Sequence, residues 1–142
     1  RSTLFPYTTL FRSQPLGSPV YFASPTGEIV SFLDRLFWTA RDELRFKPGA
    51  AIVSARRGGT TATLDVLNKY FLISQMPIVS SCYWNIIHGN TPEEILQDEE
   101  GIQIMRTVGT NMAWLLKSIE AGKRSGILQP VAKERVLTNF IR

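Results

Sequence analysis

A strand, a turn-rich loop and a helix follow one another twice along this chain, and this repeat constrains the fold more than any other feature. The first loop, 17–27, holds two prolines, two glycines and two aromatic residues, and a helical pattern of apolar residues runs from 27 to about 45. The apolar run 50–54 is followed by the loop 55–59 and by a second helical pattern, 60–74. Elements joined by such short connections predict an α/β fold with an open parallel sheet.

Two strands are expected besides the run 50–54. Leu16 lies where a strand before the first loop is expected, and the run 77–83 is predicted to be another buried strand. We expect Cys82, near the end of that run, to be a small buried apolar residue. The segment 84–90 is expected to be a long loop.

The last part of the chain is predicted to be mainly helical. Thr91 and Pro92, followed by two acids, have the form of a helix start. A long helix is expected from 98 to about 121, with Gly122 as its C-cap. Trp114 lies off the apolar stripe of this helix, either at the edge of the core or in a subunit interface. The stripe consists of Met105, Val108, Met112, Leu115 and Ile119.

Three loops are expected at one edge of the sheet, because the carboxyl ends of parallel strands lie together. These loops are 17–27, 54–60 and 83–91, and they are the segments richest in Gly, Ser, Thr, Arg and aromatic residues. Open parallel sheets bind their ligands outside this edge. A loop that combines a fixed backbone with flat apolar side chains suits a planar, partly polar ligand.

Residues 1–13 resemble the translation of one reading frame of a sequencing-library adapter, and we expect this segment to be non-native. The alternative is a targeting segment, but the stretch has no helical apolar face, and Pro6 interrupts it. The chain has 16 basic and 12 acidic residues, so leaving out Arg1 and Arg12 lowers the net charge from +4 to +2. This small charge gives little support for a nucleic-acid partner.

Composition limits the remaining classes of function. No apolar run approaches the roughly 18 residues of a membrane span, so no membrane partner is expected. Cys82 is the single cysteine, which excludes an internal disulfide and fits a reducing, cytoplasmic location. His88 is the single histidine, so no metal site built from clustered His and Cys is expected.

Several segments in combination resemble one known family. The main ones are Gly17–Phe22, Phe32–Arg35 and Ser54–Thr60. The similarity continues through Pro77–Ser81, Tyr83–Asn85, His88–Gly89 and Asn111–Leu116. Together they are similar to the flavodoxin-like NADPH-dependent FMN reductases, in the branch of the multimeric flavodoxins and iron-sulfur flavoproteins.

The resemblance implies a flavodoxin-like open parallel sheet with strand order 2-1-3-4-5 and FMN at its carboxyl edge. By this similarity, 17–27 follows the third strand and 54–60 the fourth. Strands 1 and 2, the phosphate loop and the cysteine cluster of the iron-sulfur branch would all lie upstream, so an iron-sulfur cluster is possible only there. We therefore expect 14–142 to be the C-terminal part of an incomplete, N-terminally truncated flavodoxin-like FMN reductase domain.

The resemblance also implies which residues contact the cofactor. After the third strand these are Ser18, Pro19, Val20, Tyr21, Phe22, Thr26 and Gly27, and after the fourth they are Ser54, Arg56, Arg57, Gly58 and Gly59. The basic second loop could bind a nicotinamide dinucleotide phosphate, or negative charge that develops at the flavin pyrimidine. Hydride chemistry belongs to the flavin, so no catalytic residue is expected.

Each of these segments also has a purely structural interpretation. The first loop can be a plain turn with Tyr21 or Phe22 in the core, and the second can be a solvated basic loop. Residues 83–90 could form a lid over a flavin. For His88, we favour a turn histidine that bonds locally.

The implied function is that of an FMN-dependent NAD(P)H oxidoreductase, of the flavin or quinone reductase type, with NAD(P)H as co-substrate. Its partner would be a small-molecule electron acceptor, and the intact protein would be a homo-oligomer. A flavodoxin-type electron carrier is one alternative, but such carriers are usually strongly acidic, and a charge of +2 argues against it. The other alternative is an inactive truncated fragment, because a lost phosphate loop removes strong charge-assisted contacts to FMN.

Overall fold

The computed structural model describes residues 12–131, 133 and 136–140. Most of the adapter-like segment, 1–11, therefore lies outside the described residues. In chain order the elements are β1 (Gln14–Pro19), α1 (Gly27–Thr39), α2 (Arg41–Leu44), β2 (Gly49–Ala55), α3 (Thr60–Ile73), β3 (Ile86–His88), α4 (Pro92–Ile95) and α5 (Glu99–Arg124).

The three strands form one sheet in the order β1-β2-β3, and both pairings are parallel. The register pairs Pro19 with Ser54 and Ala55 with His88. All three strands therefore end at the same edge. The prediction of an α/β fold with an open parallel sheet is confirmed for the described residues.

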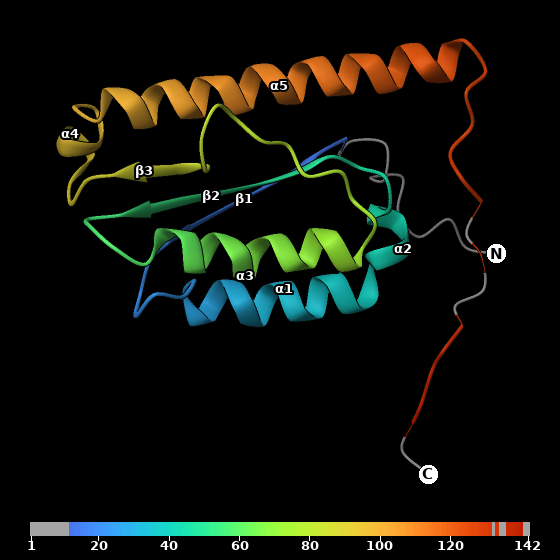
Figure 1. Ribbon diagram of the computed structural model, residues 1–142, viewed down its shortest axis with the longest axis horizontal. Coiled ribbons are helices and arrows are strands. Elements are labelled where there is room, and N and C mark those ends of the chain that lie inside the picture. The colour runs from blue at the N-terminus through green and yellow to red at the C-terminus, as the bar shows by residue number, and fades with distance from the viewer. Residues whose placement is uncertain (1–11, 132, 134–135, 141–142) are drawn as a thin grey trace.

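Helices cover both faces of this sheet: α1 and α3 lie on one face and α5 crosses the other (Figure 1). Successive residues of β2 point to opposite faces. Ala51 and Val53 belong to the larger core cluster with α1 and α3, whereas Ala50 belongs to a smaller cluster that includes Val108 of α5. The helical members of the larger cluster include Leu33, Phe37, Leu64, Leu67 and Phe71.

The predicted helix caps are present, but some helix boundaries differ from the prediction. Thr26 caps α1 through its hydroxyl oxygen, and Thr91 caps α4 in the same way. The helix expected over 27–45 is interrupted at Ala40, which separates α1 from α2. At the other end of the chain, α5 continues past its expected C-cap at Gly122.

The prediction of a strand over 77–83 is wrong. Within this described segment only Ile78 forms a bridge, to Gly49, and the chain then leaves the sheet before it returns as β3. Asn85 holds the point of return. Its backbone carbonyl joins the ladder of β2, and its side-chain amide donates a hydrogen bond to Val79 O at 3.1 Å. The strand β3 therefore lies inside the segment 84–90, which was expected to be a loop.

Cys82 lies in this excursion from the sheet and is exposed. The expectation that it is a small buried apolar residue is therefore also wrong. Its sulfur lies 4.0 Å from the hydroxyl oxygen of Thr107 on α5. The apolar run that contains Cys82 is long enough for a strand, but contact with β2 is made only at its beginning and again after Trp84.

A methyl group added at Gly49 would disturb the core. Its Cβ would lie 2.6 Å from two ring carbons of Phe71, a fully buried side chain. We expect Gly49→Ala to lower the free energy of unfolding by about 1–3 kcal/mol, the usual cost of overpacking. Gly17→Ala, in the neighbouring strand, is the matched control, because its Cβ would come no closer than 4.0 Å to Ile52 O. Urea unfolding measures both, and equal midpoints would contradict this packing.

Candidate functional site

Backbone hydrogen bonds join the three segments at the carboxyl edge. Val20 N donates to Ser54 O at 2.9 Å, which ties the loop after β1 to the end of β2. Gly89 N donates to Ala55 O at 3.1 Å, which ties the end of β2 to the segment after β3. The loops that the sequence predicts at this edge are therefore held next to one another.

The loop after β1 contains a two-residue turn in a strained conformation. Tyr21 and Ser24 exchange two backbone hydrogen bonds, of 2.9 and 3.0 Å, around Phe22 and Ala23. The φ angles of these central residues are 51° and 56°, in the left-handed region. A side chain costs about 1–2 kcal/mol there, and strain of this kind concentrates at functional sites.

This turn presents its aromatic side chains to solvent. Phe22 is fully exposed, at 105%, and Tyr21 is 61% exposed. The interpretation that places either ring in the core is therefore wrong. An exposed ring on a fixed backbone offers a flat apolar surface that a planar ligand can cover.

Ser18, near the end of β1, and Thr26, the N-cap of α1, form hydrogen bonds at the two ends of the first loop. Ser18 is buried, and its Oγ accepts from Thr26 N at 3.1 Å and donates to Pro19 O at 2.8 Å. Thr26 Oγ1 accepts from Ile29 N at 3.4 Å, and Gly27 begins α1. The hydroxyl groups of Ser18 and Thr26 are therefore used to fix the shape of the loop, which leaves its backbone and the exposed rings of Tyr21 and Phe22 available for a ligand.

The loop after β2 contacts the first loop at Gly59. The φ angle of Gly59 is +88°, and a Cβ there would lie 2.9 Å from both Ala23 Cα and Val20 Cγ1. The position therefore needs glycine for its conformation and for the close approach of the two loops. Gly58 differs, because it is exposed and nothing lies within 4 Å of its ideal Cβ. The two loops form one continuous surface.

The N-terminus of α3 gives this surface a positive character. Gly59 caps α3 without a side-chain hydrogen bond, and the first turn contains no acid. Arg56 and Arg57 are exposed, and neither forms an ion pair within the described part of the chain. Unpaired N–H groups at a helix start and nearby cations favour an anionic or electron-rich group.

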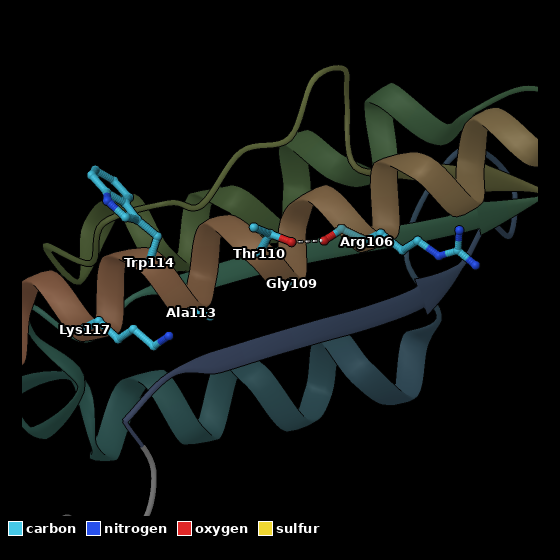
Figure 2. A pocket seen from close by; sticks show the side chains of 6 residues that line it. All are labelled: Arg106, Gly109, Thr110, Ala113, Trp114 and Lys117. Atoms are coloured by element: carbon cyan, nitrogen blue, oxygen red, sulfur yellow. Dashed lines mark hydrogen bonds between the residues drawn. The ribbon is translucent and has the colours of Figure 1, made fainter.

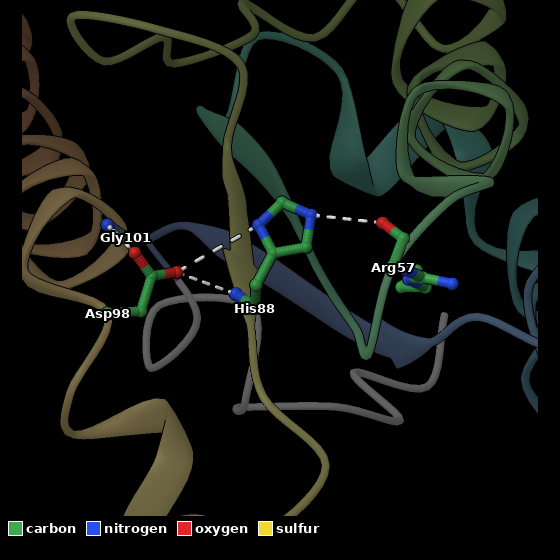
Figure 3. A network of polar contacts seen from close by, with 4 residues as sticks. All are labelled: Arg57, His88, Asp98 and Gly101. Atoms are coloured by element: carbon green, nitrogen blue, oxygen red, sulfur yellow. Dashed lines mark hydrogen bonds and ion pairs between the residues drawn. The ribbon is translucent and has the colours of Figure 1, made fainter.

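His88 links the second loop to the start of α5 (Figure 3). Its Nε2 lies 3.1 Å from Arg57 O, and its backbone N donates to Asp98 Oδ2 at 2.7 Å. Asp98 Oδ1 accepts from Gly101 N at 2.9 Å and so caps α5. The prediction of a turn histidine that bonds locally is wrong, because His88 lies in β3 and its ring bonds to a residue 31 positions away. No local sequence signal identifies this contact.

Two further aromatic residues lie just before β3. The rings of Tyr83 and Trp84 pack edge to face, with centroids 4.6 Å apart, and both side chains are about half exposed. A lid formed by this segment stays a prediction. Ala23, which lies against the Gly59 position, was not predicted as a site residue, because alanine carries no signal for a left-handed turn.

A shallow hollow of about 710 Å³ lies along α5 (Figure 2). Thr110 Oγ1 is bonded to Arg106 O of its own helix at 3.0 Å, and Trp114 is 68% exposed rather than at the edge of the core. Polar groups from different elements do not converge here, so the hollow is a weaker candidate for a ligand site than the loop edge. Its lining residues are Arg106, Gly109, Thr110, Ala113, Trp114 and Lys117.

Among the described residues, no helix combines the length and the apolar character needed to cross a membrane. In the same part of the chain, His, Cys, Asp and Glu side chains nowhere gather in threes around a point that could hold a metal ion.

One protein family and a curated protein match the sequence of this chain. The profile of the NADPH-dependent FMN reductase family matches residues 16–91, more than half of the chain, from β1 through β3. An iron-sulfur flavoprotein of Methanocaldococcus jannaschii is 29% identical over 117 residues, which cover 74% of this chain and 58% of that protein. The chain thus spans little more than half the length of this relative.

A solved structure has a similar fold. It is a flavodoxin, WrbA-like protein from Agrobacterium tumefaciens, with a TM-score of 0.54 and 16% sequence identity, covering 70% of this chain and 66% of that chain. At this identity the likeness concerns the fold alone. It confirms the prediction of a flavodoxin-like arrangement, of which the described residues contain three strands.

The contacts of Asp98 lower the pKa of its carboxyl group. The hydrogen bond from Gly101 N is the largest cause, and the backbone N–H and ring of His88 act in the same direction, whereas partial burial opposes them. A carboxyl group whose pKa is lowered on folding stabilises the fold at pH values above its unfolded pKa, near 3.9. That stabilisation is lost as the pH falls through the folded pKa.

Asp98→Asn retains an oxygen for capping but removes the charge. We expect the free energy of unfolding of the variant to be about 0.5–1 kcal/mol lower than that of the parent at neutral pH, because the charge interacts favourably with the start of α5. The difference should shrink as the pH falls below the unfolded pKa and through the folded pKa, because the parent carboxyl then also takes up its proton. Urea unfolding at neutral pH and along an acid series measures this, and a deficit that does not depend on pH would contradict the assignment.

Proposed function

Because the chain belongs to the NADPH-dependent FMN reductase family, we propose that its carboxyl-edge loops bind the isoalloxazine ring of FMN in a protein that oxidises NAD(P)H. The strained turn at Phe22–Ala23 is the observation that carries this proposal. Phe22 adds nothing to the core, because its ring is fully exposed. A conformation that costs about 1–2 kcal/mol per residue fits a contact made with a ligand outside the chain.

The residues at the edge fit the two ends of a flavin ring. One end of isoalloxazine is a flat apolar dimethylbenzene, and the other is a pyrimidine rich in hydrogen-bonding groups. Tyr21 and Phe22 supply exposed flat side chains for stacking. Arg57 and Gly58 supply positive charge and an exposed backbone beside the start of α3, which suits the polar end.

When bound, FMN would supply two-electron redox chemistry between NAD(P)H and a small acceptor such as a flavin or quinone. The chain binds and orients the ring. Arg56 and Arg57 favour negative charge at the polar end, in the way that fixed positive groups stabilise developing charge in enzymes. The fixed turn at Phe22 covers part of the ring and limits how it can lie. None of these roles needs a side-chain acid or base.

An iron-sulfur cluster is not part of this proposal. The name of the Methanocaldococcus relative includes one. Such clusters are held mainly by several cysteine thiolates, whereas this chain contains a single cysteine, Cys82.

Riboflavin and FMN should bind this chain with similar affinity if the loops hold the ring and not the phosphate. We expect dissociation constants within about threefold of each other, because charge-assisted phosphate contacts would favour FMN by about tenfold or more. Quenching of flavin fluorescence measures both. A clear preference for FMN would place the phosphate at the arginine loop and contradict this orientation. Absence of saturable binding of either flavin would contradict the proposed function.

Gly59→Ala should separate the two loops that form the surface. Its Cβ would meet Ala23 and Val20 and would occupy a left-handed conformation, so we expect riboflavin affinity to fall about tenfold. Gly109→Ala, on α5 and outside these loops, is the control, because nothing lies within 4 Å of its ideal Cβ. We expect that variant to bind within about twofold of the parent. Fluorescence titration of both variants tests this, and equal affinities would argue against a shared surface.

A further inference from the structure

We propose that His88 is a positioning residue, which aims the backbone N–H of Gly58 at the candidate flavin site by holding the Arg57 carbonyl (Figure 3). The contact between His88 and Arg57 stands on the geometry of the described residues. Its importance for a flavin rests on the proposed function.

Both nitrogen atoms of the His88 ring face specific groups. A carbonyl oxygen can only accept, so Nε2, which lies 3.1 Å from Arg57 O, carries a proton. Nδ1 lies 3.9 Å from Asp98 Oδ2. Asp98 is itself held by the N–H groups of His88 and Gly101, at 2.7 and 2.9 Å. The ring therefore rests against a carboxylate that is fixed at the start of α5.

The middle of the second loop depends on this contact. Arg56, Arg57 and Gly58 are exposed, and in the described part of the chain their backbone makes no other hydrogen bond. The two ends of the loop are fixed separately, at Ala55 by a bond from the segment after β3 and at Gly59 by close packing. The contact with His88 therefore fixes the middle of the second loop, between these two ends.

Fixing the Arg57 carbonyl also fixes the next N–H group. The peptide between Arg57 and Gly58 is planar, so its N–H points opposite to its C=O. With the carbonyl directed at His88, the Gly58 N–H is directed away from that ring, and it has no acceptor among the described residues. His88 thus presents an unpaired donor at the carboxyl edge, as a polar ligand edge requires.

Two amide substitutions separate this contact from simple loss of the ring. The side-chain nitrogen of glutamine reaches about as far as Nε2 of histidine, and that of asparagine about as far as Nδ1. His88→Gln therefore keeps a donor for the Arg57 carbonyl, whereas His88→Asn keeps polarity beside Asp98 but loses the donor. Comparison of the two variants thus isolates the bond to Arg57.

Trypsin cleavage after Arg57 reports on the contact in the flavin-free chain, because the scissile carbonyl is the one that His88 holds. We expect His88→Asn to speed this cleavage about five- to tenfold relative to cleavage after Arg124, and His88→Gln to change it less than about twofold. Mass spectrometry of the fragments over time gives both rates. Equal rates in the two variants would overturn the proposal.

Riboflavin titration then tests the role in the site. We expect His88→Asn to weaken binding about fivefold and His88→Gln to restore it to near the parent value. If the parent binds riboflavin and both variants bind it equally, the proposed function stands and the positioning role of His88 is overturned. If the parent binds no flavin, the proposed function fails and the aim of Gly58 at a flavin fails with it, whatever the trypsin rates show for the contact.

Discussion

The parallel pairing of β2 with both of its neighbours is the constraint on which the candidate site depends. Because β1, β2 and β3 run in one direction, Pro19, Ala55 and His88 reach the same edge of the sheet. Two cross-strand bonds, from Val20 to Ser54 and from Gly89 to Ala55, continue this order into the loops. Residues that are far apart in sequence thereby form one surface, and the pairing of the strands, not contacts between sequence neighbours, brings them together.

The loops at this edge are more constrained than surface loops need to be. Gly59 packs so closely on Ala23 that a Cβ would not fit, and Phe22 is held in the left-handed region with its ring in solvent. His88 fixes the carbonyl of Arg57 between these points. Such rigidity costs conformational free energy, and pre-organisation of a binding surface is the physical benefit that offsets it.

Sequence alone predicted the parts of the fold that local patterns specify. Apolar spacing and capping residues such as Thr26 located the main helices, and the repeat of strand, loop and helix located the edge. The prediction failed where contacts between residues far apart in sequence determine the path of the chain. The run 77–83 has the composition of a strand, but Asn85 determines where the chain rejoins β2. The turn at Phe22–Ala23 was equally unpredictable, because neither residue favours the left-handed region in isolation.

Amide chemical-shift mapping tests most directly the claim that the three loops form one flavin-binding surface. Riboflavin is added to the isotope-labelled chain, and the shifts are followed by heteronuclear NMR. The account predicts that the perturbed amides cluster in 20–24, 55–60 and 84–90, with the shift change of the Gly58 amide among the largest. Perturbations that instead gather along the outer face of α5 around Trp114, or the absence of any change at the edge of the sheet, would contradict it.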